Sequence, residues 1–500
     1  MKRLLSSVLA AVSLSAFAAW ERIGSLQVAD MATQGDAIAR LGSYMGNPLA
    51  AAGMAAAIAD MPTIKFFGPM RPKTPMAFVL YWGAEDAASA ATNALGCLEY
   101  AFLYPMSISK AEFLKRHDGA VETNGVVFVK GGVFDDSDTY VVFSPDGKWA
   151  GASDKVEQAT LALAEIALAE KPLAGDALRL RLDEKAFAKL GEVIGEAESK
   201  AEAEGVHVKI DKQSLDVLKA VRAFACGIRV SDAGIDLRGS TRFAKDSEAA
   251  SFGLKPLAAN ALAFAGRDAV SASAWAEDSG MRGMSGKDWD DLFDIFKRNG
   301  ADLSRFISRA ALPGGDKFTV DFAAIMKAVK ETTDKGEDAM EKMSGKLEKV
   351  VEELVPRFGS TKCSKGPAYA CAVSLKGVEP QWPVAERFAE TLPEAAGKPV
   401  SAVWFYSLSS ILRAAASEAL VLVPEEQRAV MKPMLDQFCA ETKRGVAGML
   451  WQKDGAQRFF FRISADEFRT VGSLVSSAMM FGVSSSVQAV EFDDGDEDED

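Results

Sequence analysis

Histidine is scarce in this sequence, with only His117 and His207 among 500 residues. Because histidine is the commonest metal ligand and the usual base of a catalytic triad, its scarcity argues against most histidine-dependent metal sites and triads. The chain also lacks a Gly-x-Ser-x-Gly elbow, a Walker loop and a Gly-x-Gly-x-x-Gly turn after a strand. An α/β-hydrolase and a nucleotide-binding protein therefore have no support, and we expect no cofactor.

Basic charge is also in short supply. The chain has 57 Lys and Arg against 70 Asp and Glu, a formal net charge of −13. Proteins that bind nucleic acid need clustered Lys and Arg to neutralise phosphates. We therefore expect no nucleic-acid partner.

Cysteine is infrequent, and no Cys-x-x-Cys pair occurs among the five residues, so a zinc ribbon or a thioredoxin motif is not predicted. Cys363 and Cys371 lie eight residues apart around a Lys-Gly-Pro turn and are the candidates for a disulfide. The remaining cysteines, expected to be small buried residues, are Cys97, Cys226 and Cys439.

The N-terminus carries the pattern of a secretory signal peptide. Lys2 and Arg3 precede an uncharged stretch over residues 4–19, and Ala16-Phe17-Ala18 matches the cleavage pattern of small residues. We expect residues 1–18 to be removed and the protein to be periplasmic or secreted.

The C-terminus combines an uncharged stretch with an acidic tail. Val471–Val490 is long enough to cross a bilayer, but it contains six serines and two glycines, and its C-terminal flank is acidic rather than basic. We therefore expect a packed helix and no membrane span after signal cleavage. Eight of residues 491–500 are acidic, which predicts a disordered tail that could bind a cation weakly.

Short strand and helix patterns mix along the chain and predict an α+β fold. An Ala-rich helical region is expected over about 28–60, a buried strand over 76–82 and a helix over 85–102. Pro145-Asp146-Gly147 predicts a hairpin between strands at 139–144 and 148–152.

One order of elements, namely strand, helix, helix and hairpin, occurs twice. It begins at Leu178–Leu182 and again at Ala402–Leu408, and each hairpin turns at a Gly-containing loop. This repetition predicts an internal duplication: two similar lobes with antiparallel sheets and packed helices, over 19–250 and 251–490. A helical insertion is expected in the second lobe, at about 285–355.

The insertion carries a seam of residues at alternate spacings of three and four, which is typical of a heptad repeat. Thr333 and Gly336 weaken its middle, so a break into a helical hairpin is expected. A helix that packs on its own lobe is the favoured interpretation. The alternative is a partner-binding helix, whose candidate contact residues are Met340, Met343 and Leu347.

Ser107-Ile108-Ser109-Lys110 matches the Ser-x-x-Lys pattern of serine acyl-enzymes, but the companion motifs are absent, so we expect no catalytic role. Paired carboxylates remain an open route to glycan or peptide hydrolysis, since the two partners can lie far apart in sequence.

Lys171-Pro172-Leu173-Ala174 and Lys255-Pro256-Leu257-Ala258 precede corresponding parts of the two halves. Together with the signal peptide and the repeated helix-hairpin unit, they give a sequence that resembles uncharacterised duplicated α+β proteins exported to the bacterial envelope. The resemblance implies an envelope or secreted protein and supplies no site residue.

The sequence therefore favours an exported, non-enzymatic binding or scaffold protein of the bacterial envelope, with an envelope protein or a glycan as its partner. The alternative is a periplasmic or secreted hydrolase that acts on glycan or peptide through carboxylates.

Overall fold

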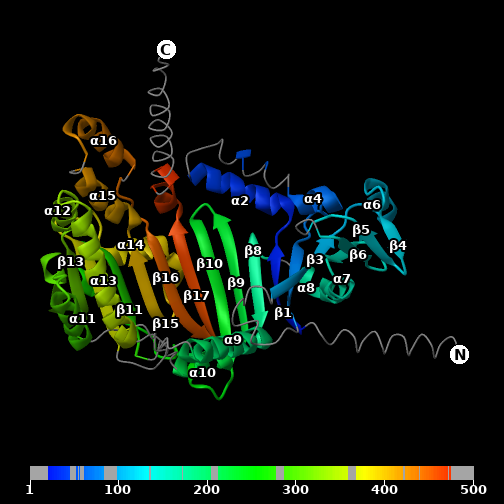
Figure 1. Ribbon diagram of the computed structural model, residues 1–500, viewed down its shortest axis with the longest axis horizontal. Coiled ribbons are helices and arrows are strands. Elements are labelled where there is room, and N and C mark those ends of the chain that lie inside the picture. Colours follow the sequence, from blue (N-terminus) through cyan, green and yellow to red (C-terminus); the bar gives the residue numbers. More distant parts are fainter. Residues whose placement is uncertain are drawn as a thin grey trace, which may run out of the picture.

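The computed structural model describes residues 21–44, 52–53, 56, 61–83, 98–133, 137–171, 173–203, 212–258, 260–277, 286–358, 368–420, 423–438, 440–470 and 472–473. These residues form mixed helices and one large sheet, which confirms the α+β class (Figure 1). The predicted signal peptide and the predicted disordered tail lie outside the described residues.

The strands described in the first half of the chain are β1 (Glu21–Val28), β2 (Met76–Trp82), β3 (Leu98–Pro105), β4 (Val121–Thr123), β5 (Val126–Val129), β6 (Thr139–Phe143), β7 (Trp149–Ser153), β8 (Leu178–Asp183), β9 (Val221–Ser231) and β10 (Gly234–Phe243). The strands of the second half are β11 (Ala269–Trp275), β12 (Ile307–Leu312), β13 (Gly315–Val320), β14 (Tyr369–Leu375), β15 (Val400–Tyr406), β16 (Val446–Lys453) and β17 (Ala456–Ser464).

The helices of the first half are α2 (Met31–Tyr44), α4 (Pro62–Phe67), α6 (Lys110–Arg116), α7 (Val156–Ala162), α8 (Ile166–Ala169), α9 (Glu184–Ala203) and α10 (Lys212–Ala220). Those of the second half are α11 (Gly286–Arg298), α12 (Phe322–Thr333), α13 (Glu337–Phe358), α14 (Val384–Thr391), α15 (Leu408–Ala419) and α16 (Glu425–Phe438).

All the strands join one open sheet, in the order β4-β5-β6-β7-β3-β2-β1-β8-β9-β10-β17-β16-β15-β11-β14-β13-β12. Every pairing is antiparallel except that of β13 with β14. The hydrogen bonding continues across the predicted boundary near residue 250, because β10 pairs with β17 over nine residue pairs. The two halves therefore share a sheet rather than carrying one each.

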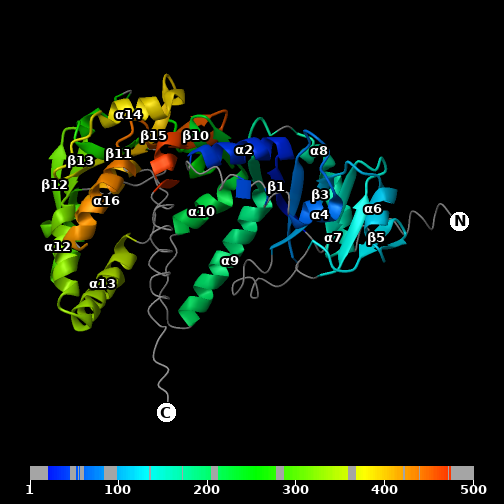
Figure 2. The same ribbon diagram turned by 90° about the horizontal axis from the view of Figure 1, so that it is seen from above.

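The sheet is curved like an arch, with helices on both sides (Figure 2). On the convex side, α7 and α8 cover β1–β3, and α14 covers β11 and β15. On the concave side, α4 and α6 close one end through a Phe-rich core, and α11 packs Trp289 on Phe318 at the other. Between these packed ends lie the middle strands, in the sheet order β8, β9, β10, β17, β16 and β15.

Several expected elements agree with the structure. The hairpins β6–β7, β9–β10 and β16–β17 are confirmed. The expected break in the heptad seam of the insertion is also confirmed, because α12 ends at Thr333 and α13 begins at Glu337, with Gly336 at a φ of 82°.

Three expectations were wrong in part. Residues 21–28 form β1, a strand that the sequence patterns did not indicate. Leu98–Phe102 was expected to be helical but lies in β3, because pairing with β2 and β7 outweighs the local helical pattern. The insertion at 285–355 also contains the β12–β13 hairpin and is therefore not wholly helical.

Candidate functional site

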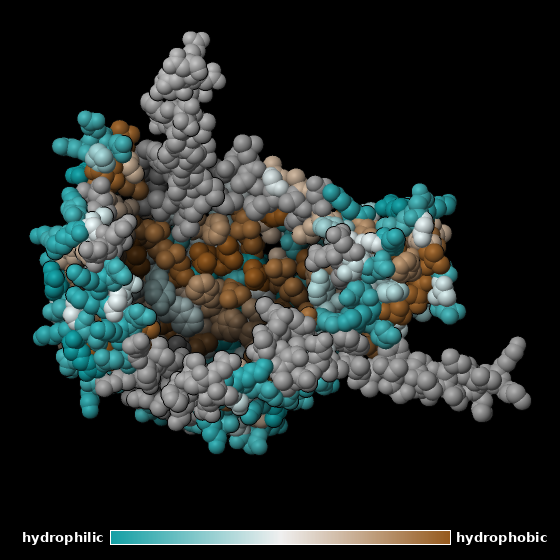
Figure 3. Space-filling view, in the orientation of Figure 1, coloured by the Kyte–Doolittle hydropathy of each residue, from teal (hydrophilic) through white to brown (hydrophobic). Residues whose placement is uncertain are grey.

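The concave side of the middle strands carries a continuous set of apolar side chains, which we call the concave apolar face. Figure 3 shows these strands at the floor of a hollow that is hydrophobic at its centre and hydrophilic around it. Each residue of this face is partly buried. The residues are Leu178, Leu180, Leu182, Phe224, Ile228, Leu237, Trp404, Leu450, Phe459 and Phe461.

Strand β8 shows how the sequence builds this face. It reads Leu-Arg-Leu-Arg-Leu-Asp, and alternate residues of a strand point to opposite sides of a sheet. Leu180 pairs with Cys226 in β9 and Leu182 with Phe224, so the apolar set continues into the next strand. The arginines of β8 consequently point to the convex side.

The register of the β10–β17 pairing continues the concave apolar face from the first half of the chain to the second. Leu237 in β10 lies opposite Ile228 on one side and Phe461 on the other. The ring of Phe459 stacks with that of Phe224, with centroids 6.3 Å apart, through the gap above Gly239. Any side chain at Gly239 would collide with the Phe459 ring, so glycine is required for this contact.

The convex side of β8 to β10 is polar, whereas that of β15 to β17 packs against α14 through Val403, Met449 and Phe460. Arg179 and Arg238 both bind the buried carboxylate of Asp176, at 2.7 and 2.5 Å, and Arg458 lines the same shallow pocket of about 330 Å³. In an antiparallel sheet with one solvated face, the polar face is normally the one in water and the apolar face is packed. In β8 to β10 the apolar side chains lie on the concave side, where they are only partly buried.

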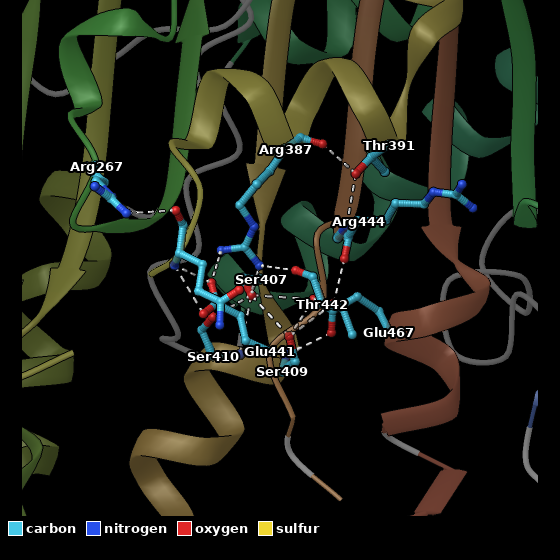
Figure 4. Close-up of polar contacts among 12 residues, drawn as sticks. Arg267, Arg387, Thr391, Ser407, Ser409, Ser410, Glu441, Thr442, Arg444 and Glu467 are labelled. Atoms are coloured by element: carbon cyan, nitrogen blue, oxygen red, sulfur yellow. Dashed lines mark hydrogen bonds and ion pairs between the residues drawn. The ribbon is translucent and has the colours of Figure 1, made fainter. Parts of the chain in front are cut away.

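A buried polar cluster lies where the chain leaves the sheet after β17 (Figure 4). Residues 465–470 are helical, and Glu467 among them is 0% exposed. Its carboxylate accepts hydrogen bonds from the Ser409 backbone N–H at 2.7 Å and the Ser409 hydroxyl at 3.0 Å. Glu467 thereby satisfies orphan donors at the start of α15 and fixes the departing chain to that helix.

Arg387 of α14 completes the cluster. Its guanidinium is also 0% exposed, donates to the Ser407 hydroxyl at 2.5 Å and the Thr442 carbonyl at 3.0 Å, and lies over the Phe405 ring. Glu441 is 3.6 Å from Arg387. The cluster is enclosed by protein, so we assign it to holding α14, α15 and the chain after β17 together rather than to binding a substrate.

Burial raises the pKa of the Glu467 carboxyl from 4.5 to about 7, against the opposing effects of the Ser409 hydrogen bonds and the Arg387 charge. A carboxyl with a raised folded-state pKa stabilises the fold most below its unfolded pKa, and this contribution is lost as pH rises through the folded pKa. The protein should therefore lose stability between about pH 4.5 and pH 7 through this group.

Glu467→Gln is expected to remove roughly 2–3 kcal/mol of this pH dependence, because the amide keeps an acceptor for Ser409 and does not titrate. The measurement is urea unfolding of both proteins at pH 5 and pH 7.5. Glu277→Gln is the control, because the Glu277 side chain is 58% exposed. Its free energy of unfolding should depend on pH as that of the wild type does. If the free energy of unfolding changed equally between pH 5 and pH 7.5 in wild type and Glu467→Gln, the raised pKa would not belong to Glu467.

The predicted partner helix is only partly described. Leu347 lies on α13 and is 46% exposed, and Val351 one turn later is 54% exposed. The side chains of Met340 and Met343 lie outside the described residues. Partner binding by this helix stays a prediction.

The disulfide between Cys363 and Cys371 also stays a prediction, because Cys363 lies outside the described residues. Cys371 is in β14, with its Sγ atom 3.1 Å from the Ser273 hydroxyl.

The Ser-x-x-Lys residues are not brought together. The Ser107 hydroxyl donates to the Pro69 carbonyl at 2.6 Å, and the Lys110 ammonium binds Glu122 at 2.5 Å. Within the described part of the chain, no three His, Cys, Asp or Glu side chains are placed to hold a metal ion, and every helix is too short or too polar to span a bilayer.

The residues of the concave apolar face were not singled out from the sequence. The Leu-Arg alternation of β8 indicated a half-buried strand but not which side of the sheet would stay open. Comparison with protein-family models, curated proteins and solved structures finds no match to the chain. The candidate site therefore depends on its own geometry.

Proposed function

We propose that this chain is an exported, non-enzymatic binding protein of the bacterial envelope that holds an apolar ligand on the concave apolar face. The observation that carries the proposal is a continuous set of ten apolar side chains on the concave side of the sheet that are only partly buried. Contiguous exposed apolar surface of this kind marks binding sites in soluble proteins.

The chemistry of the face favours a hydrocarbon chain as the ligand. The middle strands β8, β9, β10, β17, β16 and β15 are each hydrogen-bonded on both sides, so the face offers no free strand edge to an extended peptide. A peptide lying across the face would leave its own backbone groups unpaired, which is costly, whereas an acyl chain has none. An amphiphile with a long acyl chain therefore fits better than an extended peptide or a glycan.

We also propose that the two halves arose by duplication. The supporting observation is that β1-β8-β9-β10 and β11-β15-β16-β17 pair in the same order, each with a hairpin as its last two strands. The two four-strand units meet at their last strands, because β10 pairs with β17 in the antiparallel sense at the centre of the sheet.

The ligand proposal predicts saturable binding of a dansyl-labelled fatty acid to the purified mature chain, seen as a blue shift of dansyl emission. Phe461→Glu is expected to weaken this binding at least tenfold, because a carboxylate would be placed against the acyl chain in the middle of the face. The side chain of Phe461 is only partly buried, and a wild-type circular dichroism spectrum is required of the variant before its binding is compared.

Val430→Glu is the matched control, since it adds the same charge at a 64% exposed apolar position on α16. It should bind the probe like wild type. Absence of saturable binding in every protein, or equal binding by Phe461→Glu, would overturn the proposal.

The hydrolase alternative calls for a carboxyl of raised pKa in an open cleft. Among the described residues, Glu467 is the carboxyl whose pKa is raised, and it is fully buried in the polar cluster. No described observation favours hydrolysis over binding.

A further inference from the structure

Arginine side chains gather on the convex side of β8, β10 and β17, although the protein as a whole is acidic, with a formal net charge of −13. Strand alternation and register direct the members of this set, which we call the convex arginine cluster, to one side of the sheet. They are Arg179, Arg181, Arg238, Arg242 and Arg458. A concentration of positive charge on an acidic protein indicates a negatively charged partner.

Small residues form the floor of the pocket between these arginines. Ala225 and Gly227 of β9 and Ser240 of β10 line this space of about 330 Å³. Ser240 lies beside Ala225 in β9 on one side and beside Arg458 in β17 on the other. A side chain at Gly227 would collide with the Asp176 carboxylate, so glycine allows that carboxylate to lie against the sheet. The pocket is therefore a shallow depression with arginines at its walls.

One buried carboxylate orients two members of the cluster. The Oδ2 atom of Asp176 accepts hydrogen bonds from Nε and a terminal nitrogen of Arg179, and its Oδ1 atom accepts the same pair of bonds from Arg238. Contacts of this forked kind fix the plane of a guanidinium as well as its position. A single carboxylate carries one negative charge, so the two guanidiniums that share it keep a net positive charge.

The other members of the cluster have weak partners or none. Arg458 lies 3.6 Å from Asp454, whose side chain is 73% exposed, and a surface pair of this kind contributes little. The Nε atom of Arg458 is buried and has no hydrogen-bond partner among the described residues. Within the described part of the chain, the side chains of Arg181 and Arg242 form no ion pair. These guanidiniums therefore have donors to offer to a ligand.

Neighbouring carboxylates in the same strands are held by other cations. Asp183 of β8 binds Arg22, and Asp236 of β10 binds Arg462. Burial and then the positive charges of neighbouring arginines lower the pKa of the Arg181 guanidinium. Positive charge on this side of the sheet is therefore left without a full counter-charge.

The chemistry of the pocket favours a phosphate group over a single carboxylate. Every cation of the cluster is an arginine, and a guanidinium offers a planar fork of N–H donors that matches phosphate oxygens. A phosphate monoester carries nearly two negative charges and three acceptor oxygens, which suits an excess of several cations. Trp451 also lines the pocket and offers an apolar surface to the group that carries the phosphate.

We propose that this convex pocket binds the phosphate group of a monoester, with Arg238 and Arg458 at its walls and the Ser240 hydroxyl on its floor as donors. Arg181 and Arg242 add positive potential around it. The pocket lies on the opposite side of the sheet from the concave apolar face, so this site does not depend on the proposed function. The monoester is either a soluble molecule or the headgroup of a lipid, and the experiments below separate these two sources.

Isothermal titration calorimetry of the purified protein with inorganic phosphate and with glycerol phosphate, at low ionic strength and pH 7.5, should show saturable binding. Arg458→Gln is expected to weaken this binding about tenfold or more, because one charge-assisted contact is lost. Arg413→Gln is the matched control, since it removes the same charge at a 48% exposed position on α15 and should bind as the wild type does. Absence of saturable binding, or equal affinities of wild type and Arg458→Gln, would overturn the proposal.

A second variant tests the floor of the pocket. Ser240→Glu places a carboxylate among the arginines, where it should take the place of the phosphate and abolish binding. It should also raise the melting temperature at low ionic strength, because it adds a negative charge to an excess of positive charge. Val430→Glu adds the same charge at an exposed position on α16 and should change neither property. Phosphate binding by Ser240→Glu with wild-type affinity would contradict the site.

Flotation with vesicles separates the two sources of the phosphate. Phosphatidic acid in phosphatidylcholine vesicles presents the same monoester as glycerol phosphate, but on a lipid. Flotation that Arg458→Gln abolishes and glycerol phosphate competes away would assign the site to a lipid headgroup. Saturable binding of glycerol phosphate without flotation would assign it to a soluble ester. Flotation that Arg458→Gln leaves unchanged, with no saturable binding of glycerol phosphate, would overturn the proposal. The outcome of the fatty-acid titration affects none of these results.

Discussion

Replacing Arg462 with alanine is expected to lower the free energy of unfolding by about 3–5 kcal/mol. Arg462 lies in β17 with its side chain 7% exposed, and its fork pairs with Asp236 of β10 at 2.6 and 3.0 Å. Its other side binds Glu394 at 3.0 and 3.2 Å and the Thr391 carbonyl at 3.2 Å. The variant would leave the Asp236 carboxylate buried at the join of the two halves without its cation.

The measurement is urea unfolding of the protein followed by circular dichroism. Arg469→Ala is the matched control, because Arg469 is 55% exposed and its contact with Asp466 is a surface pair worth about 1 kcal/mol or less. The double variant Arg462→Met with Asp236→Leu should recover most of the loss, since it removes both buried charges. A loss below about 1 kcal/mol for Arg462→Ala would contradict this account.

Arg387→Ala is expected to destabilise the protein by a similar amount, about 3–5 kcal/mol, and to change its pH dependence. The variant removes the cation that faces Glu467 and leaves the Ser407 and Thr442 acceptors without their donor. Because the Arg387 charge lowers the pKa of Glu467, its loss should raise that pKa above about 7. The pH range in which stability falls should therefore move upward.

Urea unfolding at a series of pH values measures both effects. Arg413→Ala serves as the control, since Arg413 is 48% exposed and lies 3.6 Å from Asp436 on the surface. It should change stability by about 1 kcal/mol or less and leave the pH range unchanged. If the stability of Arg387→Ala fell over the same pH range as that of the wild type, the Arg387 charge would not affect the pKa of Glu467.

The sequence predicted the elements whose pattern is local. The hairpin turns contain residues that adopt positive φ, namely Gly147 in one and Asp454 and Gly455 in the other. The break between α12 and α13 follows from the same property of Gly336. The first residues of β3 were predicted to be helical, because their strand conformation depends on pairing with β2 and β7, which are distant in sequence.

The candidate site is formed by contacts between residues that lie far apart in the sequence. Leu180 and Phe461 lie on one face only because several intervening ladders set their register. Arg387 and Glu467 are 80 positions apart in the sequence and follow no motif. Patterns along the chain could therefore indicate strands with one apolar side, but neither the hollow nor the buried polar cluster.

The ladder between β10 and β17 also bears on solubility. An unpaired strand edge is a template for association with another chain, and antiparallel pairing allows a strand to pair with a second copy of itself. A fragment that ended before the second half would present all ten residues of β10 as such an edge. In the intact chain each half caps the other, and the outer edges are left to β12 and to β4, which has only three residues. The nine-pair join therefore acts as a safeguard against aggregation as well as a structural connection.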